Sequence, residues 1–241
     1  SLHDRARRDG HAWSRLLGPL CLSLALLAGE LGISAWAYLL AHALSFERGP
    51  LVRRVAVLWP HALVTSLWGG AYLASGAGAS GSGVYLHPLA EPVAFARELP
   101  ARAAALLGAA FGPIPSDLSF VGTGGMMPVA AALAVLLVGA LLWVARGELR
   151  RDPSSRFWWL GTLLAVLPVA ASFPSDRLLL LVNVGAMAIV ARTIRAVWPS
   201  AGAVGSVSPV GSGSRALAGA LVLVHGVLSP GYIRGAVRGS R

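Results

Sequence analysis

Residues 126–145 read MMPVAAALAVLLVGALLWVA, which is twenty positions without a charged side chain. A helix of about 20 apolar residues is long enough to cross the hydrocarbon core of a bilayer. Charges follow at once, because the segment 146–156 holds four arginines, and arginine-rich borders are typical of membrane-spanning helices. This stretch therefore predicts a transmembrane helix and sets the fold class expected for the rest of the chain.

The composition of the whole chain agrees with this prediction. Its 241 residues are 56% hydrophobic and only 12% charged, whereas soluble domains carry about 25% charged residues. The apolar residues come in blocks and not at amphipathic spacing. We therefore expect an all-α fold, a polytopic transmembrane helical bundle with about five to seven spans. The blocks are 16–44, 55–75, 126–145, 157–172 and 178–191, followed by a weaker one at 216–228.

The first block is longer than one span needs. Residues 16–44 form a run of 29 positions, and Glu30 stands in its middle, between Gly29 and Gly32. Two alternatives follow: one long tilted helix, or two shorter helices that break at this glycine-flanked glutamate.

The second block and the long connection after it carry further signals. Pro60 lies inside the block 55–75, where we expect it to kink the helix. The connection 76–125 opens with a glycine and serine run. It contains the stretch 92–111, which predicts an interfacial helix with Arg97, Glu98 and Arg102 on its wet face.

The chain divides into three parts. Residues 1–199 form the predicted transmembrane region, 200–214 are a Gly/Ser linker, and 215–241 are a weak apolar segment with a basic tail. The chain begins at Ser1, and we interpret it as an internal piece of a longer polypeptide that continues beyond residue 241.

The net charge of +10 comes from arginine alone, because every one of the 20 basic residues is Arg. These arginines lie at the ends of apolar blocks and form no stripe interleaved with aromatic residues, which argues against a nucleic-acid partner. The connections 48–54, 146–156 and 192–215 are the arginine-rich ones. They predict the cytoplasmic side of a multi-pass inner-membrane protein, with the loop 76–125 outside. Lysine-free, Ala/Gly/Arg-rich usage is typical of a bacterial genome of high GC content.

Three residues are candidates for a functional site: Glu30, Asp176 and Arg177. A carboxylate inside an apolar block costs about 2.5–3.5 kcal/mol on insertion scales and commonly serves function; alternatively, Glu30 is a solvated turn residue. Asp176 and Arg177 begin a predicted helix after a turn. Either Ser175 or Asp176 caps that helix, with a local ion pair between Asp176 and Arg177, or Arg177 binds an anion such as a lipid phosphate.

The sequence predicts no metal site, no cofactor and no catalytic motif within this chain. Cys21 is the only cysteine, so no internal disulfide or cysteine cluster can form. No histidine pairs with another at the four-residue spacing of a zinc helix.

The run 24–30, LALLAGE, is followed by an apolar helix, a short arginine-rich connection, another span and a long outer loop. This order resembles the middle of the GT-C membrane glycosyltransferases that use polyprenyl-phosphate-linked sugars. Their corresponding run reads Leu-Leu-Ser-Lys-Glu, and here Gly29 stands where the lysine would be, so only Glu30 carries over. The stretch 157–191 separately resembles segments of large bacterial polytopic membrane proteins of uncharacterised function, which implies a membrane class and no chemistry.

The glycosyltransferase resemblance implies sugar transfer from a lipid-phosphate donor at the outer face, with dependence on a divalent metal. It also places the catalytic acidic residue on a loop upstream of this chain, so no catalytic residue is assigned here. The sequence leaves open whether the protein is an enzyme at all. The alternatives are a transporter with Glu30 on its pathway, and a membrane scaffold that needs no chemistry.

Overall fold

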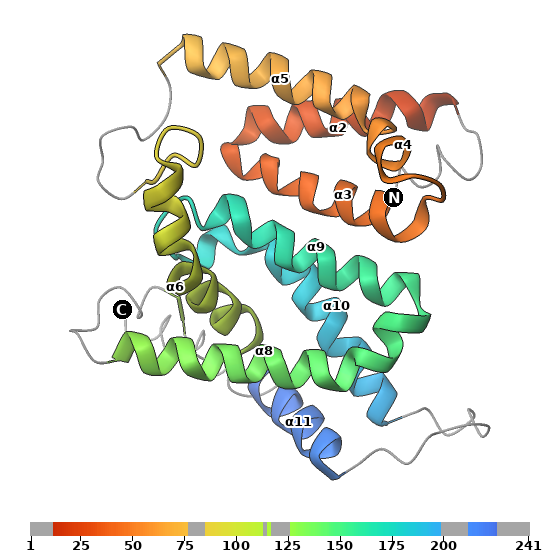
Figure 1. Cartoon of the computed structure of the whole chain (residues 1–241), viewed down its shortest axis with the longest axis vertical. Coiled ribbons are helices and arrows are strands. Elements are labelled where there is room, and N and C mark those ends of the chain that lie inside the picture. Colours follow the sequence, from red (N-terminus) through yellow and green to blue (C-terminus); the bar gives the residue numbers. More distant parts are fainter. Residues whose placement is uncertain (1–11, 77–84, 113–114, 117–125, 199–211, 226–241) are drawn as a thin grey trace, which may run out of the picture.

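The computed structural model describes residues 12–76, 85–112, 115–116, 126–198 and 212–225 (Figure 1). These residues form helices joined by turns and loops, and no β-strand occurs among them. The all-α prediction is therefore confirmed. The glycine and serine run after Gly76, the stretch 117–125, most of the linker 200–214, most of the arginine-rich start and the basic tail lie outside the described residues.

The first apolar block breaks at Glu30. Helix α2 (Ala12–Ala28) ends before Gly29, the 3-10 helix η1 (Glu30–Ser34) follows, and α3 (Ala35–Phe46) runs back along the bundle. A Cβ atom on Gly32 would lie 2.7 Å from the carbonyl carbon of Ala25, so glycine is needed where η1 passes α2. The two-helix alternative is correct, and the single tilted helix is wrong.

The second block forms two helices, α4 (Leu51–Ala56) and α5 (Trp59–Ala74). Pro60 lies in the first turn of α5, where its missing amide hydrogen would have had no partner within the helix. The expected kink inside one helix is therefore wrong, because the proline begins a new helix.

The remaining helices lie close to their predicted ranges. Helix α6 (Pro92–Phe111) confirms that residues 92–111 are helical. Helix α8 (Met126–Arg151) begins where the predicted span 126–145 begins and extends six residues beyond it, into the charged segment. Helix α9 (Pro153–Val169), the 3-10 helix η2 (Asp176–Leu178) and α10 (Leu180–Val197) follow. Helix α11 (Ser212–Leu223) overlaps the last residues of the predicted linker.

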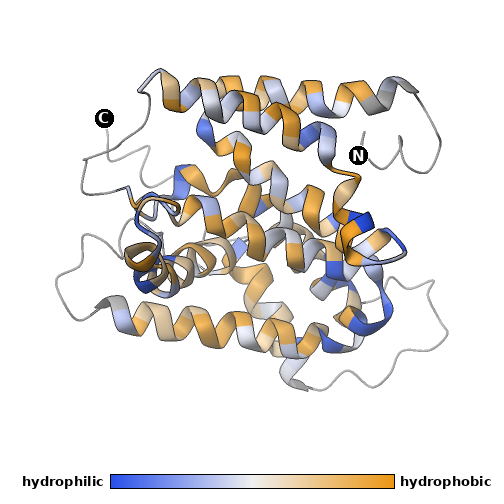
Figure 2. Cartoon of the chain, turned by 45° about the horizontal axis from the view of Figure 1, so that its top comes forward, coloured by the Kyte–Doolittle hydropathy of each residue, from blue (hydrophilic) through white to orange (hydrophobic). Residues whose placement is uncertain are grey.

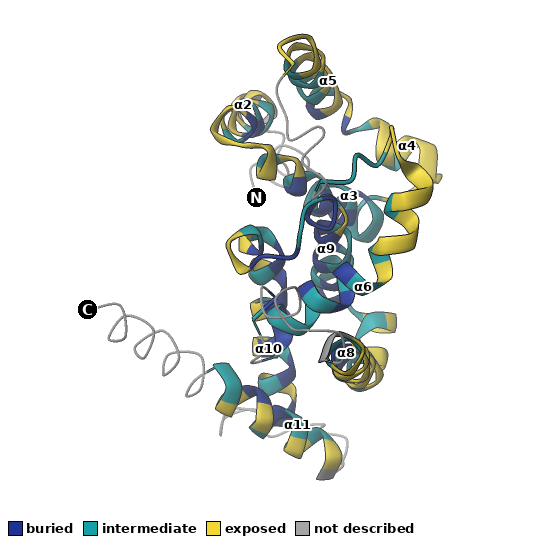
Figure 3. Ribbon diagram, turned by 90° about the vertical axis from the view of Figure 1, so that its left-hand side faces the viewer, coloured by how far each residue is buried: buried dark blue, intermediate teal, exposed yellow. Residues whose placement is uncertain are grey.

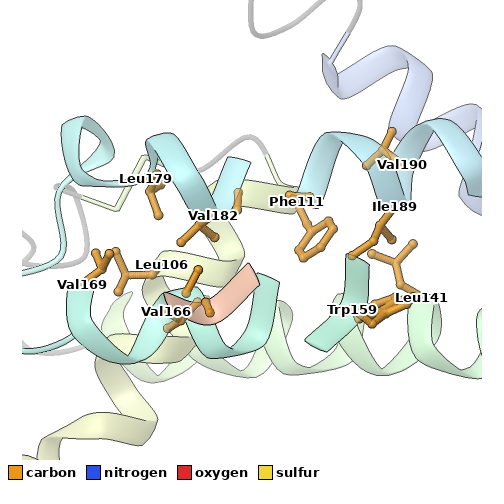
Figure 4. Close-up of a cluster of buried hydrophobic side chains, with 14 of the residues drawn as sticks. Leu106, Phe111, Leu141, Trp159, Val166, Val169, Leu179, Val182, Ile189 and Val190 are labelled. Atoms are coloured by element: carbon orange, nitrogen blue, oxygen red, sulfur yellow. The ribbon is translucent and has the colours of Figure 1, made fainter. Parts of the chain in front are cut away.

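Helices α3, α9 and α10 lie at the centre of the bundle, with α6 and α8 against them (Figures 1 and 3). Their buried apolar side chains form one core, in which the rings of Phe111 and Trp159 stack with centroids 6.0 Å apart. Figure 4 shows this core, which includes Leu106 from α6, Leu141 from α8, Val166 and Val169 from α9, and Leu179, Val182, Ile189 and Val190 near or on α10.

Two glycines allow the three central helices to approach closely. A Cβ atom on Gly161 would lie 2.5 Å from the Tyr38 ring, and one on Gly185 would lie 2.1 Å from Oγ1 of Thr162. The Tyr38 hydroxyl fits into this gap and donates to the carbonyl oxygen of Leu181 at 2.6 Å. Small residues at a helix interface are the usual means of close packing in bundles that lack a solvent-driven hydrophobic effect.

Helices α2 and α5 pack on each other at the periphery of the bundle (Figure 3). Two side-chain hydrogen bonds link α5 to the chain of η1 and α3: Trp36 Nε1 donates to Oγ1 of Thr65 at 2.7 Å, and the Tyr72 hydroxyl donates to the Glu30 carboxylate. We call α2 and α5 the peripheral pair, and α3, α9 and α10 the central trio.

Hydrophilic residues lie at both ends of the bundle (Figure 2), and the connections at one end hold more arginines than those at the other. The α3–α4 connection, the α8–α9 corner and the last turn of α10 lie at one end, which we call the arginine-rich end. The α2–α3 break and the α9–α10 turn lie at the other, which we call the Glu30 end. The connections therefore alternate between the ends in the order that the arginine counts predict.

An ion-pair cluster joins three helices at the arginine-rich end. The NH2 group of Arg192 on α10 lies 3.2 Å from Glu148 Oε2 on α8 and 2.5 Å from Asp152 Oδ2 at the corner. The backbone amide of Ser154 also donates to Asp152 at 2.9 Å. This amide first, and then the Arg192 charge, lower the pKa of the Asp152 carboxyl.

Large apolar side chains cover the outside of the bundle, which is unusual for a protein surrounded by water. Two helices among the described residues, Pro128–Arg151 and Leu180–Val197, are long and apolar enough to cross a membrane. Helices α2, α5 and α9 have 17, 16 and 17 residues, fewer than the roughly 20 of an average span. Helix length alone therefore does not establish five to seven spans.

Candidate functional site at the Glu30 end

Glu30 lies at the exposed start of η1. It forms the first cluster of polar groups together with Tyr72 and Tyr85. Its carboxylate accepts a hydrogen bond from the Tyr72 hydroxyl in the last turn of α5. The Tyr72 ring stacks on Trp68, with centroids 4.9 Å apart and planes inclined by 29°. A carboxylate beside stacked aromatic rings offers both hydrogen-bond acceptors and apolar faces. The position of Glu30 at a helix break follows from the two glycines that flank it.

The segment that precedes α6 completes this cluster. Tyr85 is half-buried, and burial, together with the negative charge of Glu30, raises the pKa of its phenol. The backbone amide of Leu86 donates to the carbonyl oxygen of Ala171 at 2.8 Å, which holds the segment against the end of α9. His87 lies edge-on to Tyr85, with ring centroids 6.1 Å apart. Sequence analysis missed both tyrosines, because nothing in the chain pattern places them next to Glu30.

Asp176 forms a second cluster with the segment after α6. Its Oδ1 accepts hydrogen bonds from the backbone amide and the hydroxyl of Ser116, at 2.8 and 2.7 Å. Neither Ser175 nor Asp176 provides a side-chain cap for η2, and α10 begins later, after Leu179. Ser175 occupies the N-cap position of η2, one of the two predicted alternatives, but the expectation of a side-chain capping bond is wrong. The Asp176 carboxylate binds Ser116 instead, which lies 60 residues away in the sequence. The spacing of neighbouring residues cannot predict such a contact.

Arg177 points its guanidinium over the ring of Phe173, with the central carbon 5.5 Å from the centroid. The side chain is exposed and makes no ion pair with Asp176, so the predicted local pair is also wrong. A guanidinium held on an aromatic face keeps its N–H edges available for an anion.

Arg102 differs from its prediction, because the structure buries it. Its NH1 group donates to the carbonyl oxygens of Ala170, Ala171 and Ser172 at 3.1, 3.3 and 2.9 Å. These carbonyls close the end of α9, where a cation is favoured by the helix dipole. The sequence did hold a signal, since residues 99, 102 and 106 share one face of α6, and that face is the one packed on the core.

An apolar cavity of 310 Å³ lies between α6 and α8. Its described wall consists mainly of small and aliphatic residues, and the one polar side chain among these described lining residues is that of Ser116, the partner of Asp176. The cavity therefore reaches the second cluster. The lining residues are Ala104, Ala105, Gly108, Gly112, Pro115, Ser116, Ala130, Leu133, Ala134 and Leu137.

The structure brings the three predicted site residues to one end of the bundle but not into one site. Among the described residues, Glu30 makes no hydrogen bond or ion pair with Asp176 or Arg177. The bond between Leu86 and Ala171 joins the segment of the first cluster to the end of α9, five residues before Asp176. No group of three or more His, Cys, Asp and Glu residues that could hold a metal ion occurs in the described parts of the chain.

No protein-family model matches the chain, and no curated protein or solved structure matches it either.

Proposed function

We propose that the chain crosses the inner membrane of a bacterium several times, with the arginine-rich end in the cytoplasm. In this arrangement α2 and α3 enter and return, α5, α8, α9 and α10 cross, and α6 lies at the outer interface. The support is the outer surface of α2, α5 and α8, where Leu24, Leu67 and Leu136 are 59%, 66% and 68% exposed. Such a surface is stable only against lipid or another apolar partner.

Site-directed labelling tests this topology. Cys21 is first replaced by serine, and single cysteines are introduced as Ser75→Cys at the Glu30 end and Ser154→Cys at the arginine-rich end. A maleimide that cannot cross membranes is expected to label the first variant in intact cells and the second only after permeabilisation. Equal labelling of the two variants in intact cells would contradict the proposal.

The activity that the Glu30 end supports best is binding of a lipid-phosphate-linked sugar, as part of a GT-C-like glycosyltransferase. The observation that carries this proposal is the apolar cavity that ends at Ser116, whose hydroxyl donates to Asp176. Asp176 is followed in the chain by the exposed Arg177. An isoprenoid chain suits such a cavity, and the guanidinium suits the phosphate. The Glu30 carboxylate and the rings of Trp68 and Tyr72 provide the hydrogen-bond acceptors and apolar faces that a sugar ring uses.

A binding experiment on the full chain in lipid nanodiscs tests this activity. A radiolabelled polyprenyl-phosphate-linked hexose is expected to bind the native chain, and Arg177→Gln to weaken binding about tenfold, the effect of losing one charged hydrogen-bond partner. Arg97→Gln removes an exposed arginine of α6 and serves as the matched control. No measurable binding, or equal loss in both variants, would refute the assignment.

A further inference from the structure

The outward face of α8 changes character along its length. Leu136 and Ala140 are exposed, then Trp143 at 60% exposure, then Arg146 and Arg150, which are exposed as well. These residues are three or four positions apart and so share one side of the helix. The face therefore runs from apolar through aromatic to cationic towards the arginine-rich end.

The aromatic and cationic residues are held together. The central carbon of the Arg146 guanidinium lies 4.2 Å from the centroid of the Trp143 ring. A guanidinium stacked in this way loses little freedom on binding and keeps its N–H edges for a planar or tetrahedral oxyanion. Tryptophan itself favours the boundary between acyl chains and headgroups.

The positive charge of this face is not neutralised by neighbouring acids. The two carboxylates of the corner, Glu148 and Asp152, both contact Arg192 on α10. Arg146 and Arg150 make no ion pair with any described residue. The two carboxylates are therefore paired with Arg192, and the positive charges of Arg146 and Arg150 can attract an anion.

The spacing fits the depth of a lipid headgroup. Arg146 and Arg150 lie three and seven residues beyond Trp143, a rise of about 4.5 Å and about 10 Å along a helix. The polar layer on one side of a bilayer is about 5–8 Å thick, so its depth falls between the two arginines. An acyl chain beside Leu136 and Ala140 would thus have its phosphate at the level of the arginines.

We propose that the outward face of α8 is a binding site for an anionic phospholipid of the cytoplasmic leaflet, with its phosphate between Arg146 and Arg150. The site rests on the proposed orientation in the membrane but is independent of any sugar-transfer activity. It would anchor the α8–α9 corner at the inner surface, where anionic lipids concentrate.

Native mass spectrometry of the delipidated full chain tests this site. The chain in detergent is titrated with phosphatidylglycerol and, separately, with phosphatidylcholine. We expect about thirtyfold tighter binding of phosphatidylglycerol, from two arginines at the surface. The preference should disappear in Arg146→Gln/Arg150→Gln and fall about fivefold in each single variant. The single variants keep the test valid if the double variant does not fold.

A matched control separates a defined site from general positive charge. Arg48→Gln/Arg53→Gln removes two exposed arginines from the same end of the bundle but from the α3–α4 region, and it should keep the preference. Equal affinity for the two lipids in the native chain would overturn the proposal, as would an equal loss in the control.

Two other occupants of this face would also overturn the proposal. Competition by millimolar inorganic phosphate would show a site for free anions. A dimer that excludes lipid would show that a second copy of the chain covers this face. The cysteine labelling of Ser75→Cys and Ser154→Cys reports on orientation separately, so failure of the lipid site and failure of the membrane topology are distinguishable.

Discussion

The central trio and the peripheral pair are both built from apolar helices, yet they are held by different forces. In the trio, Gly161 and Gly185 let the backbones approach until the Tyr38 side chain fills the space between them. In the peripheral pair, α5 packs on α2 and is tied to the α3 side by the bonds of Trp36 and Tyr72. Close packing is intolerant of added atoms, whereas a few hydrogen bonds can be lost singly at small cost. The comparison therefore predicts a rigid centre and a more easily detached α5.

The largest effect is expected from adding one methyl group to the trio. A Cβ atom in Gly185→Ala would lie 2.1 Å from Thr162 Oγ1 and 2.5 Å from the Tyr38 hydroxyl, so the helices must separate. We expect a loss of about 2–3 kcal/mol in the free energy of unfolding, measured by denaturant titration in detergent. Gly139→Ala on α8, where a Cβ meets nothing within 4 Å, should not destabilise the protein. Equal stability of the two variants would show that the trio is not closely packed.

The next effect concerns the buried arginine that closes α9. Arg102→Met keeps most of the apolar stem but removes the donor to three carbonyl oxygens. We expect a loss of about 2 kcal/mol, as for hydrogen bonds made by a charged group. Hydrogen exchange should quicken in the last turn of α9 and in the turn after it. Arg97→Met, at an exposed position of the same helix, is the control, and similar exchange in both variants would contradict a capping role.

The peripheral pair should respond more weakly and more locally. Trp36→Phe removes the hydrogen bond to Thr65 while keeping an aromatic ring, for a loss of about 1 kcal/mol. Hydrogen exchange should quicken in α5 and stay unchanged in α9 and α10. A double-mutant cycle with Thr65→Val measures the coupling directly, and a coupling near zero would mean that this bond does not hold α5.

The smallest effect is expected from the ion-pair cluster at the arginine-rich end. Because the folded-state pKa of Asp152 is lowered, its contribution to stability is present above the unfolded pKa of about 3.9 and is lost as the pH falls through the folded pKa. Its side chain is 36% exposed, so solvent screening limits the contribution to at most about 1 kcal/mol. Unfolding measured between pH 6 and about pH 3 should show this loss in the native chain and not in Asp152→Asn. An identical pH dependence in the two would show that the pair contributes nothing.

The sequence predicted helices better than it predicted their polar contacts. Apolar runs and charged borders located α6, α8, α9 and α10 to within several residues, because both features are local. A break at Glu30 was one of the two alternatives that the sequence left open, because the flanking glycines are also a local feature. The partners of Glu30 and Asp176 were not predicted, since Tyr72 is 42 residues from the first and Ser116 is 60 residues from the second.

Arg102 and Pro60 were misplaced for a different reason. A charged residue near an interface was expected to face water, but the open carbonyls at the end of α9 offer it a buried alternative. Proline was expected to bend a helix, but a chain that can begin a new helix at Trp59 places the proline in its first turn without losing a hydrogen bond.

By itself, the sequence determined the all-helical class, the glycine-flanked position of Glu30 as the one candidate break in the first block, and the segregation of arginines to alternate connections. These properties depend on hydrophobicity, on glycine and on charge at neighbouring positions. Only the tertiary structure decided which side chains meet: Tyr38 between two glycines, Arg102 at the end of α9, Ser116 beside Asp176, and Arg192 on the acids that would otherwise neutralise the outward arginines of α8. Such contacts join residues far apart in the chain, and they depend on how closely the backbones approach, which no local pattern of residues records.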